Sequence, residues 1–452
     1  MLAHAFGERY DSPVPLSLFV LGGALVVLAS FALVYRREVA ADDAPRADVV
    51  APPRGPAWLG ALSVLVLGGL VLGGLLGSQE VSENLTPVFV WLVLWVALPL
   101  VVGVVGDFTG QVNPFAAIAR AAGSPRIRRL VLDRTAPLPW PPRLGWWVSA
   151  VVYFLVVVAE LVVNRTATLP RVTASGLLVY ALVCAAGGVV FGADAWNTRA
   201  ELWTVLFSTW GRMGRWRFRA GGRTGFAGGL DAPFEASASR VVGVLLLLVS
   251  VSFDGLLSTP QWGSFAAALP NGLASGTDGF DVLATAAFAA LTALTLVVFG
   301  AFARAAARAG EHPDGRLLPA LTGLLPSLLP IAFGYLFAHY LQYVVINGQL
   351  LLTLLGNPVG SPSWPLTPPY PFDGSYVVDT GLLPTAVLWY VQIVVIVAAH
   401  VVAVVLAHRH LGRTATTVAL ARRSEWPWLA AMVGYTMLSL WLLAQPIIER
   451  AE

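Results

Sequence analysis

The sequence predicts an all-α membrane protein, a polytopic bundle of about ten transmembrane helices with both termini on the extracytoplasmic side. Three observations support this prediction. The chain of 452 residues is 57% hydrophobic and only 12% charged, about half the charged fraction of an average soluble domain. The apolar residues gather in runs of about 20, the length with which an α-helix crosses a bilayer. The 28 basic residues, all of them Arg, fall mostly in alternate gaps between those runs.

The apolar runs define the expected spans in chain order. The first run is too long for the apolar region of a signal peptide, and it is followed by Arg36 and Arg37 rather than by small residues. We therefore interpret it as a retained helix that exports a short tail. The expected spans are 14–35, 57–77, 85–106, 145–163, 173–193, 241–258, 281–303, 318–346, 383–407 and 427–447.

The arginines orient these spans. The odd-numbered gaps hold 24 of them, and the remaining four are Arg9, Arg165, Arg171 and Arg450. Because cytoplasmic loops carry the excess of basic residues, the odd gaps should be cytoplasmic. The sequence thus predicts a plasma-membrane protein with one integral domain over residues 1–452. Within it we expect an outer tail at 1–13, a cytoplasmic amphipathic and basic segment at 195–240, and an outer Pro- and Gly-rich loop at 347–382.

The segment 195–240 combines aromatic and basic residues. Trp203, Leu206, Phe207 and Trp210 share one helical face, and five arginines follow them between 212 and 223. This pattern is typical of a surface that binds the anionic headgroups of the cytoplasmic leaflet or docks a partner subunit. Ordinary interfacial anchoring is the alternative. We expect the lipid bilayer and a homo-oligomer or partner subunit as interaction partners, and no nucleic acid.

Two absences in the sequence limit the chemistry. The chain contains no Lys, which excludes a lysine Schiff base and a lysine nucleophile. Its single cysteine, Cys184, excludes an internal disulfide, a CxxCH haem attachment and a cysteine-based zinc site.

Ionisable residues at membrane depth are costly and are therefore candidates for function. Asp254 lies at the outer end of the sixth expected span, and His339 lies in the outer half of the eighth. The two should lie at similar depth near the outer surface, so we interpret them as the candidate catalytic pair. Hydrogen-bonded helix ends without a ligand are the alternative.

Other residues on the same side are candidates for binding. Tyr335 and Gln342 share a helical face with His339, and together with Arg9 and Asp373 they are the expected substrate-binding residues. The expected ligands of a divalent metal are His4, Asp11, Asp254 and His339. A haem shared by His339 and His400 is not expected, since the two differ in depth by roughly 10–15 Å along their helices.

Several segments resemble a family of multi-span membrane proteins of actinobacteria and archaea, some of which are named fenitrothion hydrolase. The resemblance implies whole-chain membership, and the family's name implies hydrolysis of an organophosphate triester. The residues that carry it are the tail 3–11 with 13–15, then 113–115, 253–256, Thr259, Pro260, Trp262, 334–335, 338–340 and 348–349.

Three classes of function remain open from the sequence. The first is a membrane-bound, metal-dependent hydrolase of ester or phosphoester substrates with an outward-facing polar site. The second is a transporter or channel built from inverted halves, with Asp107, Asp194 and His400 reaching towards the inner side. The third is a non-catalytic subunit of a larger membrane complex.

Overall fold

The computed structural model describes residues 15–35, 55–217, 222–223, 229–230, 234–312 and 316–448. In these residues the regular structure is helical, apart from one antiparallel pair of two-residue strands, β1 (Trp216–Arg217) and β2 (Gly222–Arg223). The prediction of a helical bundle is thereby confirmed. The helices form two compact units, which we call unit 1 and unit 2. A single integral domain over 1–452 stays a prediction.

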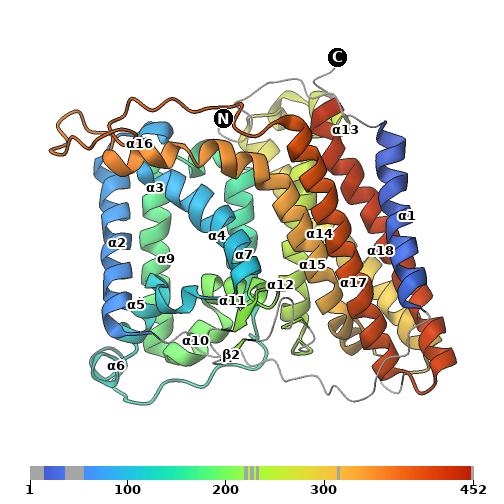
Figure 1. Cartoon of the computed structure of the whole chain (residues 1–452). Helices are drawn as coiled ribbons and strands as arrows, with labels where there is room; N and C mark the ends of the chain where they lie inside the picture. Colours follow the sequence, from blue (N-terminus) through green and yellow to red (C-terminus); the bar gives the residue numbers. More distant parts are fainter. Residues whose placement is uncertain are drawn as a thin grey trace. The chain divides into compact units, whose positions relative to one another are not determined.

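Unit 1 comprises Met1–Asp48, Leu230–His339 and Pro384–Glu452. The helix α18 packs against α1, α12, α14 and α17, and Figure 1 shows it among them. α12 and α15 are enclosed along most of their length. The described helices of this unit are α1 (Leu16–Val34), α12 (Ala238–Leu257), α13 (Pro260–Ala267), η4 (Asn271–Leu273), α14 (Asp278–Ala309), α15 (Leu317–Asn347) up to His339, α17 (Thr385–Thr414) and α18 (Val418–Ile448).

Unit 2 comprises Val49–Gly229 and Tyr340–Leu383. Its helix α9 packs against both α2 and α5, and Figure 1 shows α2 and α9 side by side. Besides the end of α15, its described helices are α2 (Ala57–Leu76), η1 (Val81–Glu83), α3 (Leu85–Val88), η2 (Phe89–Ala97), α4 (Leu98–Val105), η3 (Thr109–Gln111), α5 (Pro114–Ala122), α6 (Pro125–Leu132), α7 (Trp147–Leu161), α8 (Asn164–Ala167), α9 (Pro170–Phe191), α10 (Ala193–Arg199), α11 (Leu202–Trp210) and α16 (Leu350–Gly356).

The helices have the lengths and surfaces of a membrane-embedded protein. In the described part of the chain, nine helical stretches are long and apolar enough to cross a bilayer, and each coincides with an expected span. Their outward faces carry large exposed apolar side chains, such as Leu65 on α2, Leu182 on α9 and Val297 on α14. Large exposed apolar side chains on so many long apolar helices indicate contact with lipid. The structure therefore supports an integral membrane protein.

The remaining expected span, 145–163, the fourth in chain order, coincides with α7. This helix has 15 residues, so it covers about 22 Å, less than the ~30 Å of a bilayer core. The count of ten spans, and with it the outward position of both termini, stays a prediction.

The span at 85–105 is not a regular α-helix. Its middle, η2, is a nine-residue π-helix in which the backbone N–H of Leu98 donates to the carbonyl of Val93, five residues back. Pro99 comes directly after Leu98. It has no backbone N–H to donate to the carbonyl of Trp95, and its ring crowds the preceding helical turn. π-helical turns are rare in proteins, and those that occur are often found at functional sites.

The contact between α5 and α9 depends on glycine. A Cβ atom on Gly188 would lie 2.2 Å from the carbonyl oxygen of Ala119, whereas a Cβ on Gly176, on the same helix, would meet nothing within 4 Å. We expect Gly188→Ala to lower the melting temperature of the detergent-purified protein, because the backbone of α5 or α9 must move to make room for the added methyl group. Gly176→Ala should leave the melting temperature unchanged or raise it, since alanine is more favourable than glycine inside a helix by about 1 kcal/mol. Equal melting temperatures for the two variants would contradict this packing.

The segment 195–240 differs in one respect from the expectation of an amphipathic membrane-surface helix. All four residues of its apolar face, Trp203, Leu206, Phe207 and Trp210, are buried within the protein. This face therefore packs against the chain itself. Arg212 is buried as well, whereas Arg215 and Trp216 are exposed, and a headgroup contact of the segment stays a prediction. The loop 347–382 contains α16 and otherwise consists of turns. The expected tail 1–13 lies outside the described residues.

Candidate functional site

Asp254 and His339 lie together in unit 1. His339 Nε2 and Asp254 Oδ2 are 2.7 Å apart, and the two side chains are 18% and 15% exposed. Asp254 stands three residues before the end of α12, which stops where Ser258 and Thr259 turn the chain into α13. The Thr259 hydroxyl accepts from Trp262 N at the start of α13. The pair thus combines the end of one enclosed helix with the last third of another.

Tyr335 lies one helical turn before His339, and their ring centroids are 6.2 Å apart. The tyrosine is buried, and a Cβ atom on Gly255 would lie 2.8 Å from its hydroxyl. Gly255 therefore leaves the space that this hydroxyl occupies next to Asp254. Among the described residues, the hydroxyl has no hydrogen-bond partner. A buried donor without an acceptor is unusual, and this one is enclosed beside Asp254.

The other predicted binding residues that the structure describes belong to unit 2, not to unit 1. Gln342 is half-buried on the part of α15 that belongs to unit 2. Asp373 lies exposed in the loop of unit 2, where its carboxylate accepts from the backbone N–H and the hydroxyl of Ser375. These two hydrogen bonds lower the pKa of Asp373. His4, Arg9 and Asp11 lie outside the described residues.

The donors in the described part of the chain do not by themselves make a metal centre. Asp254 and His339 supply one oxygen and one nitrogen, whereas a catalytic zinc site uses three protein ligands. In the described ranges, no group of three or more His, Cys, Asp or Glu side chains could hold a metal ion. The predicted divalent metal would need His4 or Asp11 and stays a prediction.

Glu160 has partners that sequence reasoning missed. The sequence favours an ion pair with Arg165 at the membrane surface. In the structure, the Glu160 carboxylate accepts from the Trp95 indole N–H and from the Tyr340 hydroxyl, at 3.0 Å, within unit 2. Trp95 belongs to the π-helix η2. The sequence contains no fixed spacing that could have linked these residues.

A second His–carboxylate pair corrects another interpretation. The position of His408 beside Arg409 suggests a solvated side chain, but His408 is buried and its Nδ1 lies 2.9 Å from Glu425 Oε1. The helices α17 and α18 form a hairpin whose turn lies near residue 416. Residues equally far from that turn face each other in an antiparallel pair, and this symmetry could have identified the contact.

The polar residues that suggested a transport path belong to both units, Asp107 and Asp194 to unit 2 and His400 to unit 1. Asp107 is buried and accepts from the Thr109 hydroxyl at 2.7 Å in unit 2. Asp194 is exposed on α10. His400 is buried in unit 1, where its Nδ1 donates to the carbonyl of Ile396 on its own helix.

Comparison of this chain with models of protein families, with curated proteins and with solved structures found no match.

Proposed function

We propose that this chain is an integral membrane hydrolase of ester or phosphoester substrates, in which Asp254 and His339 form the reacting pair. The observation that carries the proposal is their 2.7 Å contact between two enclosed helices. Two ionisable side chains in such a place cost desolvation energy, and apolar residues of similar volume would often be as stable. Ionisable residues within membrane helices are functional candidates for this reason.

The chemistry follows from the tautomer that the contact favours. When His339 Nε2–H donates to the Asp254 carboxylate, Nδ1 is the basic nitrogen of the ring. It can take a proton from water while the water oxygen attacks the carbonyl carbon or the phosphorus. The carboxylate stabilises the imidazolium that forms, and the same nitrogen returns the proton to the leaving oxygen. Tyr335 would donate its hydroxyl hydrogen to the oxygen that gains negative charge.

Two further considerations support this proposal. The arginine distribution predicts that the end of α12 lies on the extracytoplasmic side, so we expect water to reach the pair from outside. The resemblance to membrane proteins named fenitrothion hydrolase includes both Asp254 and His339, and it suggests a phosphotriester as the first substrate to try.

The test is hydrolysis of p-nitrophenyl esters and a p-nitrophenyl phosphotriester by the protein in nanodiscs. We expect turnover by the wild type and a loss of about 100-fold or more in Asp254→Asn and in His339→Gln, since general-base catalysis contributes roughly 10²–10⁴-fold. Asp278→Asn, an exposed carboxylate in the first turn of α14, serves as the control. Turnover that survives in both folded pair variants would refute the assignment.

Proton-coupled transport is a second candidate, and the pair His408–Glu425 is the observation that favours it. Unit 1 thereby holds two His–carboxylate pairs, and buried polar contacts occur between its helices, Trp428 to Ser327 and Ser252 to Tyr435. Trp428 and Tyr435 are, however, seven residues apart on α18, about 10 Å. Proton flux into liposomes that is lost in Glu425→Gln and unrelated to hydrolysis would favour transport over the hydrolase.

A further inference from the structure

Unit 2 contains a cavity that the proposed hydrolase site does not use. Its volume is about 300 Å³, and it lies between α2, the π-helical span η2–α4, the start of α5, α9 and α11. An apolar cavity of about 150 Å³ in a protein interior stays dry and binds benzene. The cavity of unit 2 is therefore large enough for an apolar ligand and, because of its walls, is not a water site.

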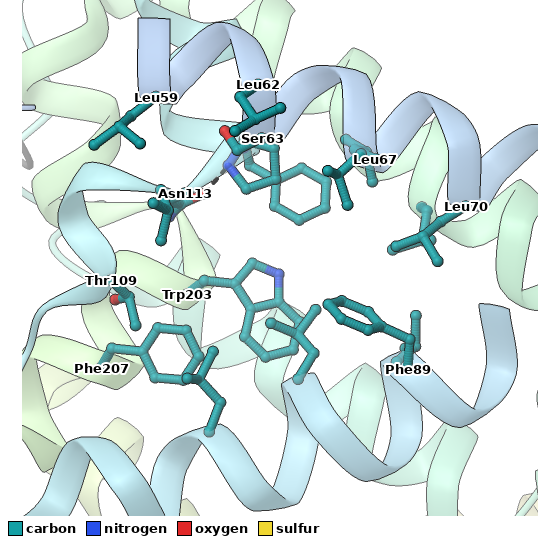
Figure 2. A pocket seen from close by; sticks show the side chains of 18 residues that line it. Leu59, Leu62, Ser63, Leu67, Leu70, Phe89, Thr109, Asn113, Trp203 and Phe207 are labelled. Carbon is teal, nitrogen blue, oxygen red and sulfur yellow. Dashed lines mark hydrogen bonds between the residues drawn. The ribbon is translucent and has the colours of Figure 1, made fainter. Parts of the chain in front are cut away.

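The walls of the cavity are mainly hydrocarbon and aromatic, and Ser63, Thr109 and Asn113 are the uncharged polar residues among them. Leu62 and Val66 of α2 form one side, and Phe89 and Leu94 of η2 form another. Figure 2 shows Trp203 and Phe207 of α11 facing α2 across the open space. No charged side chain lines the cavity. A ligand that fills it must consequently be apolar along most of its surface.

Trp203 supplies a polar contact within these walls. Its ring is held by stacking on Phe207 and by an edge contact with Trp95, and its backbone N–H donates to Glu201. Figure 2 shows the indole nitrogen directed into the cavity. An indole N–H is a donor only, so it selects a ligand with a hydrogen-bond acceptor, such as a carbonyl oxygen.

The cavity is accessible from the bilayer side of α2. Leu62 and Val66 line it and are each 50% exposed on the surface of the protein. The π-helix forms the opposite rim, and its wider turns set the positions of Phe89, Val90 and Leu94. An opening between apolar side chains on a membrane helix admits a molecule that is already dissolved in lipid.

We propose that this cavity binds one acyl chain of a membrane phospholipid, with the ester carbonyl accepting a hydrogen bond from the Trp203 indole. The chain enters between Leu62 and Val66 and packs against Phe89 and Phe207. The carbonyl is the natural acceptor, since it is a polar atom directly attached to a long hydrocarbon chain. The site is independent of the hydrolase assignment, because all of its residues belong to unit 2.

The experiment uses the full chain in nanodiscs of phosphatidylcholine that carries a photoreactive diazirine on one acyl chain. After illumination and cleavage at arginine, adducts are mapped by mass spectrometry. The peptide 200–212 contains the whole of α11, whose Trp203 and Phe207 are buried from bulk lipid. We expect adducts on this peptide in addition to those on exposed residues. Adducts confined to exposed faces of the helices would overturn the proposal.

Matched variants on α2 separate the cavity from the general surface. Leu62→Trp places a large ring at the opening and should lower the α11 adducts about tenfold. Leu65→Trp changes a residue that is 72% exposed and does not line the cavity, so adducts should remain. Equal yields from the two variants would show that the label reaches α11 by another route and would contradict the proposal.

The hydrogen bond is tested by Trp203→Phe, which keeps an aromatic ring and removes the N–H. With the ester lipid we expect about fivefold lower adduct yield at limiting lipid, the effect of one hydrogen bond. With an ether-linked lipid of the same chain length, which has no carbonyl, wild type and variant should be labelled equally. An equal loss for ester and ether lipids would contradict the role of the N–H.

Discussion

Replacing either Asp254 or His339 alone by leucine is expected to destabilise the protein more than replacing both. Each single change removes the 2.7 Å ion-pair contact from an ionisable group that is only 15–18% exposed. Breaking such a pair costs roughly 3 kcal/mol or more, whereas removing both charged groups is often neutral. The double variant Asp254→Leu/His339→Leu should therefore unfold at nearly the temperature of the wild type, and each single variant should unfold at a lower temperature.

The measurement is thermal unfolding of the four proteins in the same detergent, followed by hydrolysis assays on each. The proposed function adds a second expectation, since every variant should be inactive, including the stable double variant. A double variant that is much less stable than either single variant would mean that the pair holds α12 and α15 together. The presence of the Asp254–His339 pair would then need no functional explanation.

Glu201→Ala is expected to have the largest effect on stability in unit 2. The carboxylate is completely buried and accepts four hydrogen bonds, from the Asn113 amide at 2.6 Å, the Tyr180 hydroxyl at 3.0 Å and the backbone N–H groups of Trp203 and Thr204. Alanine would remove all four hydrogen bonds in an enclosed place, and of the donors only the Asn113 amide would keep another acceptor, the Thr204 hydroxyl at 3.2 Å. Because each buried unsatisfied group costs about 1–3 kcal/mol, we expect a loss of roughly 4 kcal/mol or more, or failure to accumulate as a folded protein.

Two further variants sharpen the Glu201 test. Glu201→Gln keeps the shape and one accepting oxygen, and it should be destabilised by roughly half as much. Glu83→Ala changes an exposed carboxylate of the same unit and should shift the melting temperature little. A small effect of Glu201→Ala, comparable with that of Glu83→Ala, would argue against the hydrogen-bond network around α11.

The parts of the fold that follow from the bilayer could be predicted from sequence. A span needs a fixed length of apolar residues, and arginine avoids crossing the membrane, so both rules act locally along the chain. The capping of α5 is equally local. Asn113 accepts from the backbone N–H groups of Phe115 and Ala116, with Pro114 in the first turn, as the Asn-Pro sequence predicts.

The long-range polar contacts could be predicted only in part. Asp254 and His339 were linked because both are ionisable and both lie near the same end of their helices. Glu201 could not be linked to its partners in the same way. Asn113 and Tyr180 lie far from it in the sequence, and neither residue is unusual by itself. The π-helical course of residues 89–97 was also missed, because apolar composition does not distinguish helices that differ only in their hydrogen-bond step.

Accessibility of position 339 to a membrane-impermeant reagent decides whether water reaches the reacting pair from the extracytoplasmic side. His339→Cys is made in a Cys184→Ala background, since Cys184 is the one cysteine of the chain, and intact cells are treated with a membrane-impermeant maleimide. We expect labelling at 339 and none at Ala338→Cys, because the side chain of Ala338 is fully buried. Labelling of His339→Cys only in inside-out vesicles, or in neither preparation, would contradict this expectation.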